Sequence, residues 1–205
     1  MRSRSLSYLL PSLGLIVFSA FVLSVTAPSA EAIADADGDG ISDAVELRFG
    51  TDPHNPDTDG DSFTDGQEIW AAFSPTSTEP IRLIKTINVD LSEQKLQQQL
   101  SGVVISEFTV STGKPGMRTP TGTFKILNKH PRAWSRSAKL WMPYWMAFTT
   151  RGHGLHELPE WPGGKKEGED HLGKPVSHGC IRLGIGAAKR LYEWSEIGTP
   201  VIIKQ

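Results

Sequence analysis

Two acidic stretches that repeat with a 22-residue offset set the strongest limit on how this chain can fold. Each places carboxylates at positions 1, 3, 5, 9 and 12 of a 12-residue loop. The five acids of the first loop are Asp35, Asp37, Asp39, Asp43 and Glu46, and those of the second are Asp57, Asp59, Asp61, Asp65 and Glu68. Like charges this close repel one another, so neither loop closes tightly unless a cation balances the charge.

The same spacing suits a hard cation. Ca²⁺ takes six to eight oxygen ligands, and alternate residues of a tight loop can turn carboxylates inward while the backbone carbonyl at position 7 adds a ligand. Those carbonyls belong to Ile41 and Phe63, so we predict two calcium sites made of the ten acids and these two residues. Ser62 stands where the sharp turn of the second loop prefers glycine. The alternative is a solvated acidic linker, which does not explain why the register occurs twice.

The acidic segment resembles the thrombospondin type 3 kind of calcium repeat more than a paired EF-hand. No long helix precedes either loop, only a short helical stretch at about residues 42–49 follows the first, and the connecting segment reads Gly50-Thr-Asp-Pro-His-Asn-Pro56. The resemblance implies a structural calcium segment that orders a spacer. The loops supply no group suited to catalysis.

Charge divides the chain into three parts. Residues 1–30, 31–80 and 81–205 carry formal charges of +2, −12 and +8, which leaves a net charge of −2. We therefore expect four segments, namely a signal peptide at residues 1–32, acidic repeats at 33–70, a linker at 71–80 and one further domain at 81–205.

The first 32 residues have the pattern of a secretory leader. Arg2 and Arg4 precede an apolar run, and Ala30-Glu31-Ala32 supplies small residues for cleavage. The alternative is an uncleaved anchor, in which case the protein would be held at the cytoplasmic membrane. Either way we expect it to act in the periplasm or cell envelope. Secreted chains in this oxidising setting usually keep Cys for disulfides, but the one Cys of this chain has no partner within the chain.

Residues 81–205 read as short apolar runs separated by turns. Strands are predicted at 81–89, 95–100, 103–110, 122–127, 145–149 and 201–204, and the best helix at 185–194. The fold class is therefore mainly β, a sandwich or barrel-like domain with one or two short helices, plus the small calcium-loop segment.

The stretch Ser177-His-Gly-Cys-Ile-Arg-Leu183 carries the most chemical information. A Cys next to Gly, just before a β-like segment, suits a nucleophile, since a substrate carbonyl has room to approach. Two alternatives are a buried structural Cys and a zinc site. The zinc ligands would be His153, His156, His178 and Cys180, but this set lacks the spacing of known zinc motifs.

Residues 81–205 resemble the catalytic domain of the YkuD-like L,D-transpeptidases. The resemblance rests on Gly154-Leu-His156, the Ser177–Leu183 stretch, the turn segments 110–114 and 119–124, and the closing segment 198–203. There are departures: 20 residues separate His156 from Ser177, with an insertion at 161–168, and Arg182 stands where many members have Asn. His153 is a second candidate base, although the Gly-Leu-His context favours His156.

The resemblance implies a cysteine acyltransferase that needs no catalytic cofactor. Cys180 would form a thioester with a peptidoglycan stem peptide and release D-Ala, while His156 would act as general base and acid. The backbone N–H groups of Gly179 and Cys180 would hold the oxyanion. Ser177, His178 and Arg182 would shape the pocket and favour the thiolate, although packing alone would also account for His178.

The same resemblance sets the expected partners and leaves alternatives open. The partners are peptidoglycan stem peptides, with no nucleic acid, and the protein is expected to be a monomer that cross-links or remodels the bacterial wall and so acts on cell shape. A wall hydrolase could use the same Cys and His with water as the acceptor. A calcium-dependent wall-binding module is the other alternative, which the presence of both Cys180 and His156 argues against.

Overall fold

The computed structural model describes residues 34–205, so the predicted leader lies outside the described residues. Along the chain the helices are α1 (Asp43–Phe49), α2 (Asp65–Ala71), the 3₁₀ helix η2 (Glu169–His171) and α3 (Ala187–Trp194). The strands are β1 (Lys85–Asp90), β2 (Lys95–Leu100), β3 (Val103–Ser111), β4 (Gly122–Lys125), β5 (Asn128–Ser135), β6 (Leu140–Ala147), β7 (Gly154–Glu157), β8 (Ile181–Leu183) and β9 (Pro200–Lys204). Within residues 34–205, no helix combines the length and the apolar character needed to cross a membrane.

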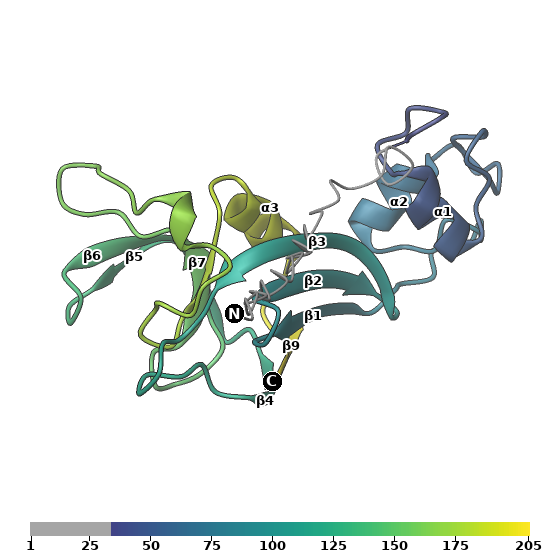
Figure 1. Cartoon of the computed structure of the whole chain (residues 1–205). Coiled ribbons are helices and arrows are strands. Elements are labelled where there is room, and N and C mark those ends of the chain that lie inside the picture. The colour runs from purple at the N-terminus through teal and green to yellow at the C-terminus, as the bar shows by residue number, and fades with distance from the viewer. Residues whose placement is uncertain (1–33) are drawn as a thin grey trace, which may run out of the picture.

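All nine strands belong to one curled sheet, which forms a half-barrel (Figure 1). Their order is β4-β9-β1-β2-β3-β8-β7-β6-β5. The β1–β9 and β7–β8 pairs are parallel, and the other neighbours are antiparallel. The predicted mainly β, barrel-like class is confirmed.

The hairpin of β1 and β2 shows why a glutamine-rich run forms a strand. Asp90 pairs with Lys95 across the turn, and along β2 every second residue is buried. The buried set is Leu96, Gln98 and Leu100, which has the period of a strand with one face on the core. Lys95, Gln97 and Gln99 lie on the outer face, Gln98 is the one polar residue of β2 on the buried face, and the predicted return strand is confirmed.

Several elements differ from the expectation. β5 was not predicted, because most of its side chains are exposed and it contains Pro131, which is tolerated since β5 is an edge strand. β6 begins at Leu140, before the predicted start at residue 145. α3 begins at Ala187, since Gly186 has a φ of 81°, and Ile185 is left exposed outside the helix.

Each acidic loop is followed by a short helix, of which only the first was predicted. α2 begins with a capping box, in which the Thr64 side chain accepts from the Gln67 backbone N–H and the Gln67 side chain accepts from that of Thr64. The Thr-x-x-Gln spacing was the sequence signal for this helix.

The acidic segment packs onto the sheet through an apolar contact. Ile41, Ile69 and Ala72 are buried in the same cluster as Ile87 and Leu96 of the sheet. A backbone hydrogen bond also joins the end of α2 to the segment before β1: the Leu83 N–H donates to the Ala72 carbonyl oxygen at 2.8 Å. The loops and the sheet therefore share one core.

This shared core predicts a large effect of truncating Ile69. Ile69 is 0% exposed, so Ile69→Ala should lower the free energy of unfolding of the full chain by about 2–5 kcal/mol in urea titrations. Leu47 in α1 is 68% exposed and is the matched control, because Leu47→Ala should change it by less than about 0.5 kcal/mol. Equal effects of the two substitutions would contradict the shared core.

Candidate functional site

Parallel pairing of β7 with β8 brings the two predicted catalytic side chains to neighbouring strands. His156 lies in β7 opposite Arg182 of β8, and Cys180 directly precedes β8. The residue pairing Leu155↔Ile181 places the chain at Cys180 beside the start of β7. The motif residues are thus brought together although 23 residues separate His156 from Cys180.

The turn that presents Cys180 is fixed by Ser177. The Ser177 hydroxyl donates to the Cys180 carbonyl oxygen at 2.6 Å and accepts from the Gly179 N–H at 3.1 Å. Gly179 has a φ of 108°, a conformation that favours glycine. The half-buried thiol Sγ lies 3.8 Å from the carbonyl oxygen of Gly152, to which it donates. Ser177 is therefore a structural support of the Cys turn.

His156 is fully enclosed, and its tautomer follows from one contact. Its Nδ1 lies 2.5 Å from the Glu157 carbonyl oxygen, which can only accept, so Nδ1 carries the proton. This leaves Nε2 with a lone pair. Burial lowers the pKa of His156 to about 4, with a further lowering by Arg182 and an opposing effect of the Glu157 bond. The imidazole is therefore neutral at neutral pH and can accept a proton through Nε2.

The thiol of Cys180 is also neutral. Burial raises its pKa, and this outweighs the lowering by a backbone hydrogen bond with Gly154 and by the charge of Arg182. Among the hydrogen bonds of residues 34–205, none joins this thiol to His156. The resting pair is a thiol just before β8 and a neutral imidazole on β7.

Arg182 does not act on the thiol as a free cation. One of its terminal nitrogens donates to both carboxylate oxygens of Glu167, at 2.9 and 3.0 Å. Glu167 belongs to the segment 161–168, predicted as an insertion, and the neighbouring Lys166 pairs with the buried Glu157 of β7. The insertion is thus held against both strands of the site, and Glu167 offsets part of the positive field that was expected to favour the thiolate.

The two remaining histidines lie at the rim of the site. His178 is exposed, and His153 is half-buried with its ring stacked on Phe148. Both line a surface cavity of about 470 Å³ together with Met117, Arg118, Ser137 and Ala138. The metal-ligating side chains that the described residues bring within 4.8 Å of one another are two aspartate triads, so the zinc set of three histidines and Cys180 is not assembled.

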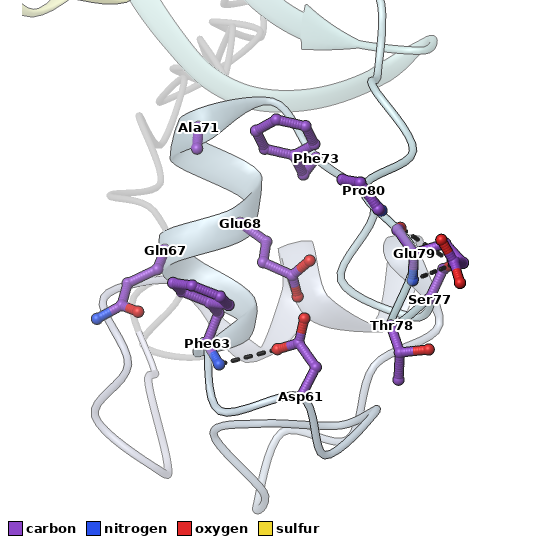
Figure 2. Close-up of a pocket in the computed structure, with 10 residues that line it drawn as sticks. All are labelled: Asp61, Phe63, Gln67, Glu68, Ala71, Phe73, Ser77, Thr78, Glu79 and Pro80. Atoms are coloured by element: carbon purple, nitrogen blue, oxygen red, sulfur yellow. Dashed lines mark hydrogen bonds between the residues drawn. The ribbon is translucent and has the colours of Figure 1, made fainter.

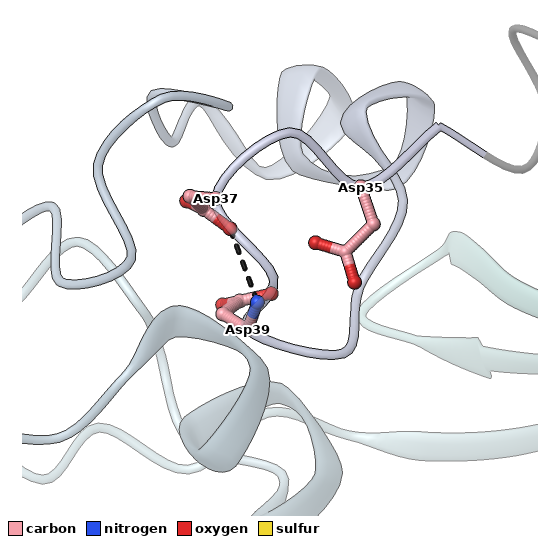
Figure 3. Close-up of side chains that lie close together, drawn as sticks. All are labelled: Asp35, Asp37 and Asp39. Carbon is pink, nitrogen blue, oxygen red and sulfur yellow. Dashed lines mark hydrogen bonds between the residues drawn. The ribbon is translucent and has the colours of Figure 1, made fainter.

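The first triad is Asp35, Asp37 and Asp39, whose side chains lie along the first loop with ligand oxygens within 4.8 Å of one another (Figure 3). The Asp39 N–H donates to Asp37 at 3.2 Å. The carboxylate at position 9 serves the loop backbone instead, because Asp43 accepts from the Ala36 N–H at 2.9 Å. Asp65 does the same in the second loop by accepting from the Thr58 N–H at 3.0 Å.

The second triad is Asp57, Asp59 and Asp61. In Figure 2 the carboxylates of Asp61 and Glu68 face each other beside the ring of Phe63. Asp61, Phe63 and Glu68 line a cavity of about 390 Å³ that extends to Phe73 and the segment 77–80. Ser62, with a φ of 82°, adopts the left-handed turn conformation expected for glycine, so this loop closes as the first one does.

Both loops fit a cation, because buried carboxylate oxygens lack a partner. Glu46 is 0% exposed, and neither of its carboxylate oxygens is hydrogen-bonded. One carboxylate oxygen each of Glu68, Asp37 and Asp59 is also buried without a hydrogen-bond partner. Burial, with the nearby Asp37, raises the pKa of Glu46 to about 7. Burial, with the nearby Asp59, does the same for Glu68. Such oxygens are costly to bury unless a proton or a cation binds them.

The class of this protein is defined by a half-barrel β-sheet with a histidine on one strand and a cysteine just before the parallel strand beside it. Comparison with known families identifies the particular family. The family described as L,D-transpeptidase catalytic domain matches residues 84–203, and the bacterial TSP3 repeat matches residues 35–56. The chain belongs to the L,D-transpeptidase catalytic-domain family and carries a TSP3 repeat before that domain.

Individual relatives agree with this assignment. A Bacillus licheniformis protein named as a candidate L,D-transpeptidase, YkuD, is 26% identical over 129 residues, which are 63% of this chain and 69% of the relative. The crystal structure of an L,D-transpeptidase from Stackebrandtia nassauensis is 27% identical with a TM-score of 0.51, covering 79% of this chain and 75% of that one. An L,D-transpeptidase from Mycobacterium smegmatis shares the fold at 24% identity and a TM-score of 0.54, covering 62% and 61%. This chain thus spans 61 to 75% of these relatives' own lengths.

The burial of Cys180 predicts slow alkylation at neutral pH. Because the thiolate is the reactive form and the pKa of this thiol lies above its ordinary value of 9.0, the rate constant for iodoacetamide should still be rising at about pH 9. Mass spectrometry of the chain at a series of pH values measures this rate, with N-acetylcysteine as the reference. A plateau below about pH 8 would show a preformed thiolate and contradict the neutral pair.

Proposed function

We propose that this protein is a peptidoglycan L,D-transpeptidase in which Cys180 is the nucleophile and His156 the general base and acid. The observation that carries the proposal is the contact between His156 Nδ1 and the Glu157 carbonyl oxygen. It leaves the Nε2 lone pair of a neutral imidazole available on β7, the strand beside the one that Cys180 precedes. Membership of the L,D-transpeptidase family supports the reaction class.

In the first half of the reaction, His156 Nε2 takes the thiol proton as the sulfur attacks the carbonyl carbon of the position-3 residue of a stem peptide. The resulting oxyanion accepts from backbone N–H groups at the cysteine turn. Two donors were predicted, the N–H groups of Gly179 and Cys180. The Gly179 N–H already donates to Ser177, so the Cys180 N–H is the one left for the oxyanion by this contact. The amide C–N bond then breaks, His156 protonates the leaving D-Ala amine, and a thioester remains.

In the second half, an amine acceptor attacks the thioester and gives its proton to His156. The new amide forms as the sulfur leaves, and the proton passes back from the imidazole to restore the thiol. The neutral resting pair suits this cycle, because each step begins and ends with a neutral imidazole. If water is the acceptor, the same acyl-enzyme yields hydrolysis.

The substrate places the reaction in the periplasm or cell envelope, in agreement with the leader predicted at residues 1–32. We assign residues 81–205 to the catalytic part and residues 33–70 to the calcium repeats, joined by residues 71–80. The protein acts as a monomer on peptidoglycan, and Ser177, His178, Gly179 and Arg182 form the turn and pocket around the nucleophile.

The catalytic assignment predicts two different losses. Incubated with a tetrapeptide stem, the full chain should gain the mass of the tripeptide acyl group, and Cys180→Ala should gain none. His156→Gln should acylate at least about 100-fold more slowly, because a glutamine amide cannot take the proton. Intact-protein mass spectrometry measures all three.

The products of the same incubation identify the acceptor. A dimer linked between two position-3 residues indicates transfer, and free tripeptide indicates hydrolysis. Acylation of Cys180→Ala at the rate of the unchanged chain would refute the nucleophile, and no acylation of the unchanged chain would refute both enzymatic readings.

The acidic segment has a structural role in this proposal. Ca²⁺ binds the two aspartate triads with Glu46 and Glu68 at position 12, and supplies the positive charge that their buried oxygens lack. Asp43 and Asp65 at position 9 support the loops through backbone contacts and act through the loop or through water. Carbonyl ligands come from Ile41 and Phe63.

Calcium should therefore raise the melting temperature of the full chain by several degrees relative to EGTA. Glu46→Gln should reduce that increase, yet melt at or above the unchanged chain in EGTA, because it removes a buried charge that has no partner. Glu93→Gln, at an exposed carboxylate, is the control and should change neither value. Differential scanning calorimetry measures these shifts, and a Glu46→Gln chain that keeps the full calcium response would contradict the assignment.

A further inference from the structure

His153 differs from His156 in which ring nitrogen carries the proton. Its Nδ1 lies 3.0 Å from the hydroxyl oxygen of Thr149. That oxygen already accepts from two backbone N–H groups, those of His153 at 3.1 Å and Arg151 at 3.3 Å. A hydroxyl has two acceptor sites and one proton, so its proton goes to His153 Nδ1. The imidazole proton of His153 therefore sits on Nε2, where His156 has a lone pair.

The Nε2–H group of His153 lies at the cysteine turn. A Cβ atom built on Gly179 would meet His153 Nε2 at 3.0 Å and Cδ2 at 2.8 Å, so the ring covers the backbone just before Cys180. The preceding residue, Gly152, supplies the carbonyl oxygen that the thiol contacts at 3.8 Å. Gly152 and His153 thus contact the cysteine turn at two points, and no hydrogen bond within residues 34–205 joins the His153 side chain to the sulfur.

The cavity beside this ring suits an anion. Arg118 and His178 line it with His153, and the Arg118 carbonyl oxygen lies 3.6 Å from the same Gly179 Cβ position. Arg118 is exposed, and it has no carboxylate partner among the salt bridges of residues 34–205. A neutral N–H donor that shares a cavity with a guanidinium suits a carboxylate, because hydrogen bonds to a charged group are charge-assisted.

We infer that His153 and Arg118 bind the C-terminal carboxylate of the residue that leaves the acyl donor, and so select donors that end one residue beyond the scissile bond. The inference rests on the proposed function. In such a donor the carboxylate carbon is three bonds from the attacked carbonyl carbon, within about one residue's length of 3.8 Å. The His153 ring covers Gly179, the residue directly before the nucleophile, so a carboxylate this close to the attacked carbonyl would lie near the ring.

This role separates His153 from a general base. The burial of the ring and the nearby Arg151 lower the pKa of His153, so it stays a neutral donor rather than a cation at neutral pH. A donor fixed on Nε2 cannot accept a proton there until it loses its own. The carboxylate therefore contributes to binding and orientation, and proton transfer remains with His156.

The test compares two tetrapeptide stems that differ only at the C-terminus, a free carboxylate and a carboxamide, and measures kcat/KM for release of the last residue. The full chain should prefer the carboxylate by 10-fold or more, as expected for a charge-assisted hydrogen bond. His153→Leu, which keeps the bulk but has no donor, should lose about 10-fold on the carboxylate and change little on the carboxamide. His153→Gln, whose amide N–H can replace Nε2–H, should keep most of the preference.

Arg118→Gln should reduce the same preference, whereas Lys125→Gln, an exposed cation that does not line the cavity, should leave it unchanged. An equal loss of His153→Leu on both peptides would overturn the inference and make the residue a support of the turn. Release of neither peptide by the unchanged chain would overturn the proposed function and this assignment with it, whereas turnover of both with no preference overturns the assignment alone.

Discussion

The chemistry of this molecule depends on the parallel pairing of β7 with β8. A parallel pair needs a crossover connection, and here the crossover runs from residue 158 to residue 180 and contains the insertion. The pairing sets His156 opposite Arg182, and the ion pairs of Glu167 and Lys166 fasten the crossover to both strands. The segment 161–168, which the sequence predicts to be an insertion, therefore also holds the two strands together. It does so with charged contacts rather than with a larger apolar core.

The sequence was sufficient for the fold class, most strands and the family, because these follow from period-2 burial and from short, specific patterns. It was not sufficient for β5, whose exposed side chains and Pro131 carry no strand signal, since an edge strand is defined by its one partner. The protonation of the histidines was also out of reach. The proton of His156 depends on the carbonyl of Glu157, and that of His153 on a hydroxyl four residues earlier, so only the folded backbone specifies them. Burial, likewise, decides the pKa of Cys180 against the charge of Arg182.

The acidic segment shows why the charge count and the packing must be read together. Its net charge suggests a separate, solvated spacer, yet Ile69 and Ala72 are buried in the core that continues into the sheet. The buried Glu46 belongs to the same segment, and its raised pKa records the cost of enclosing a carboxylate near other carboxylates. Apolar contacts hold the segment against the sheet, and charge repulsion within the loops opposes this. A bound cation would cancel this repulsion between carboxylates without adding a contact to the sheet. Its effect on the catalytic part would therefore pass through the shared core.

The two histidines three residues apart illustrate how one loop can supply opposite chemical functions. Alternation along an extended chain would put residues 153 and 156 on opposite faces. In agreement, His156 is buried within β7, whereas His153 is half-buried at the surface cavity. Each ring is fixed through Nδ1, one by donating to a carbonyl and the other by accepting from a hydroxyl. The consequence is that one Nε2 can take a proton and the other can only give a hydrogen bond. A site that must both activate a thiol and hold an anion beside it needs these two states at once, and fixed neighbours secure them without any change of charge.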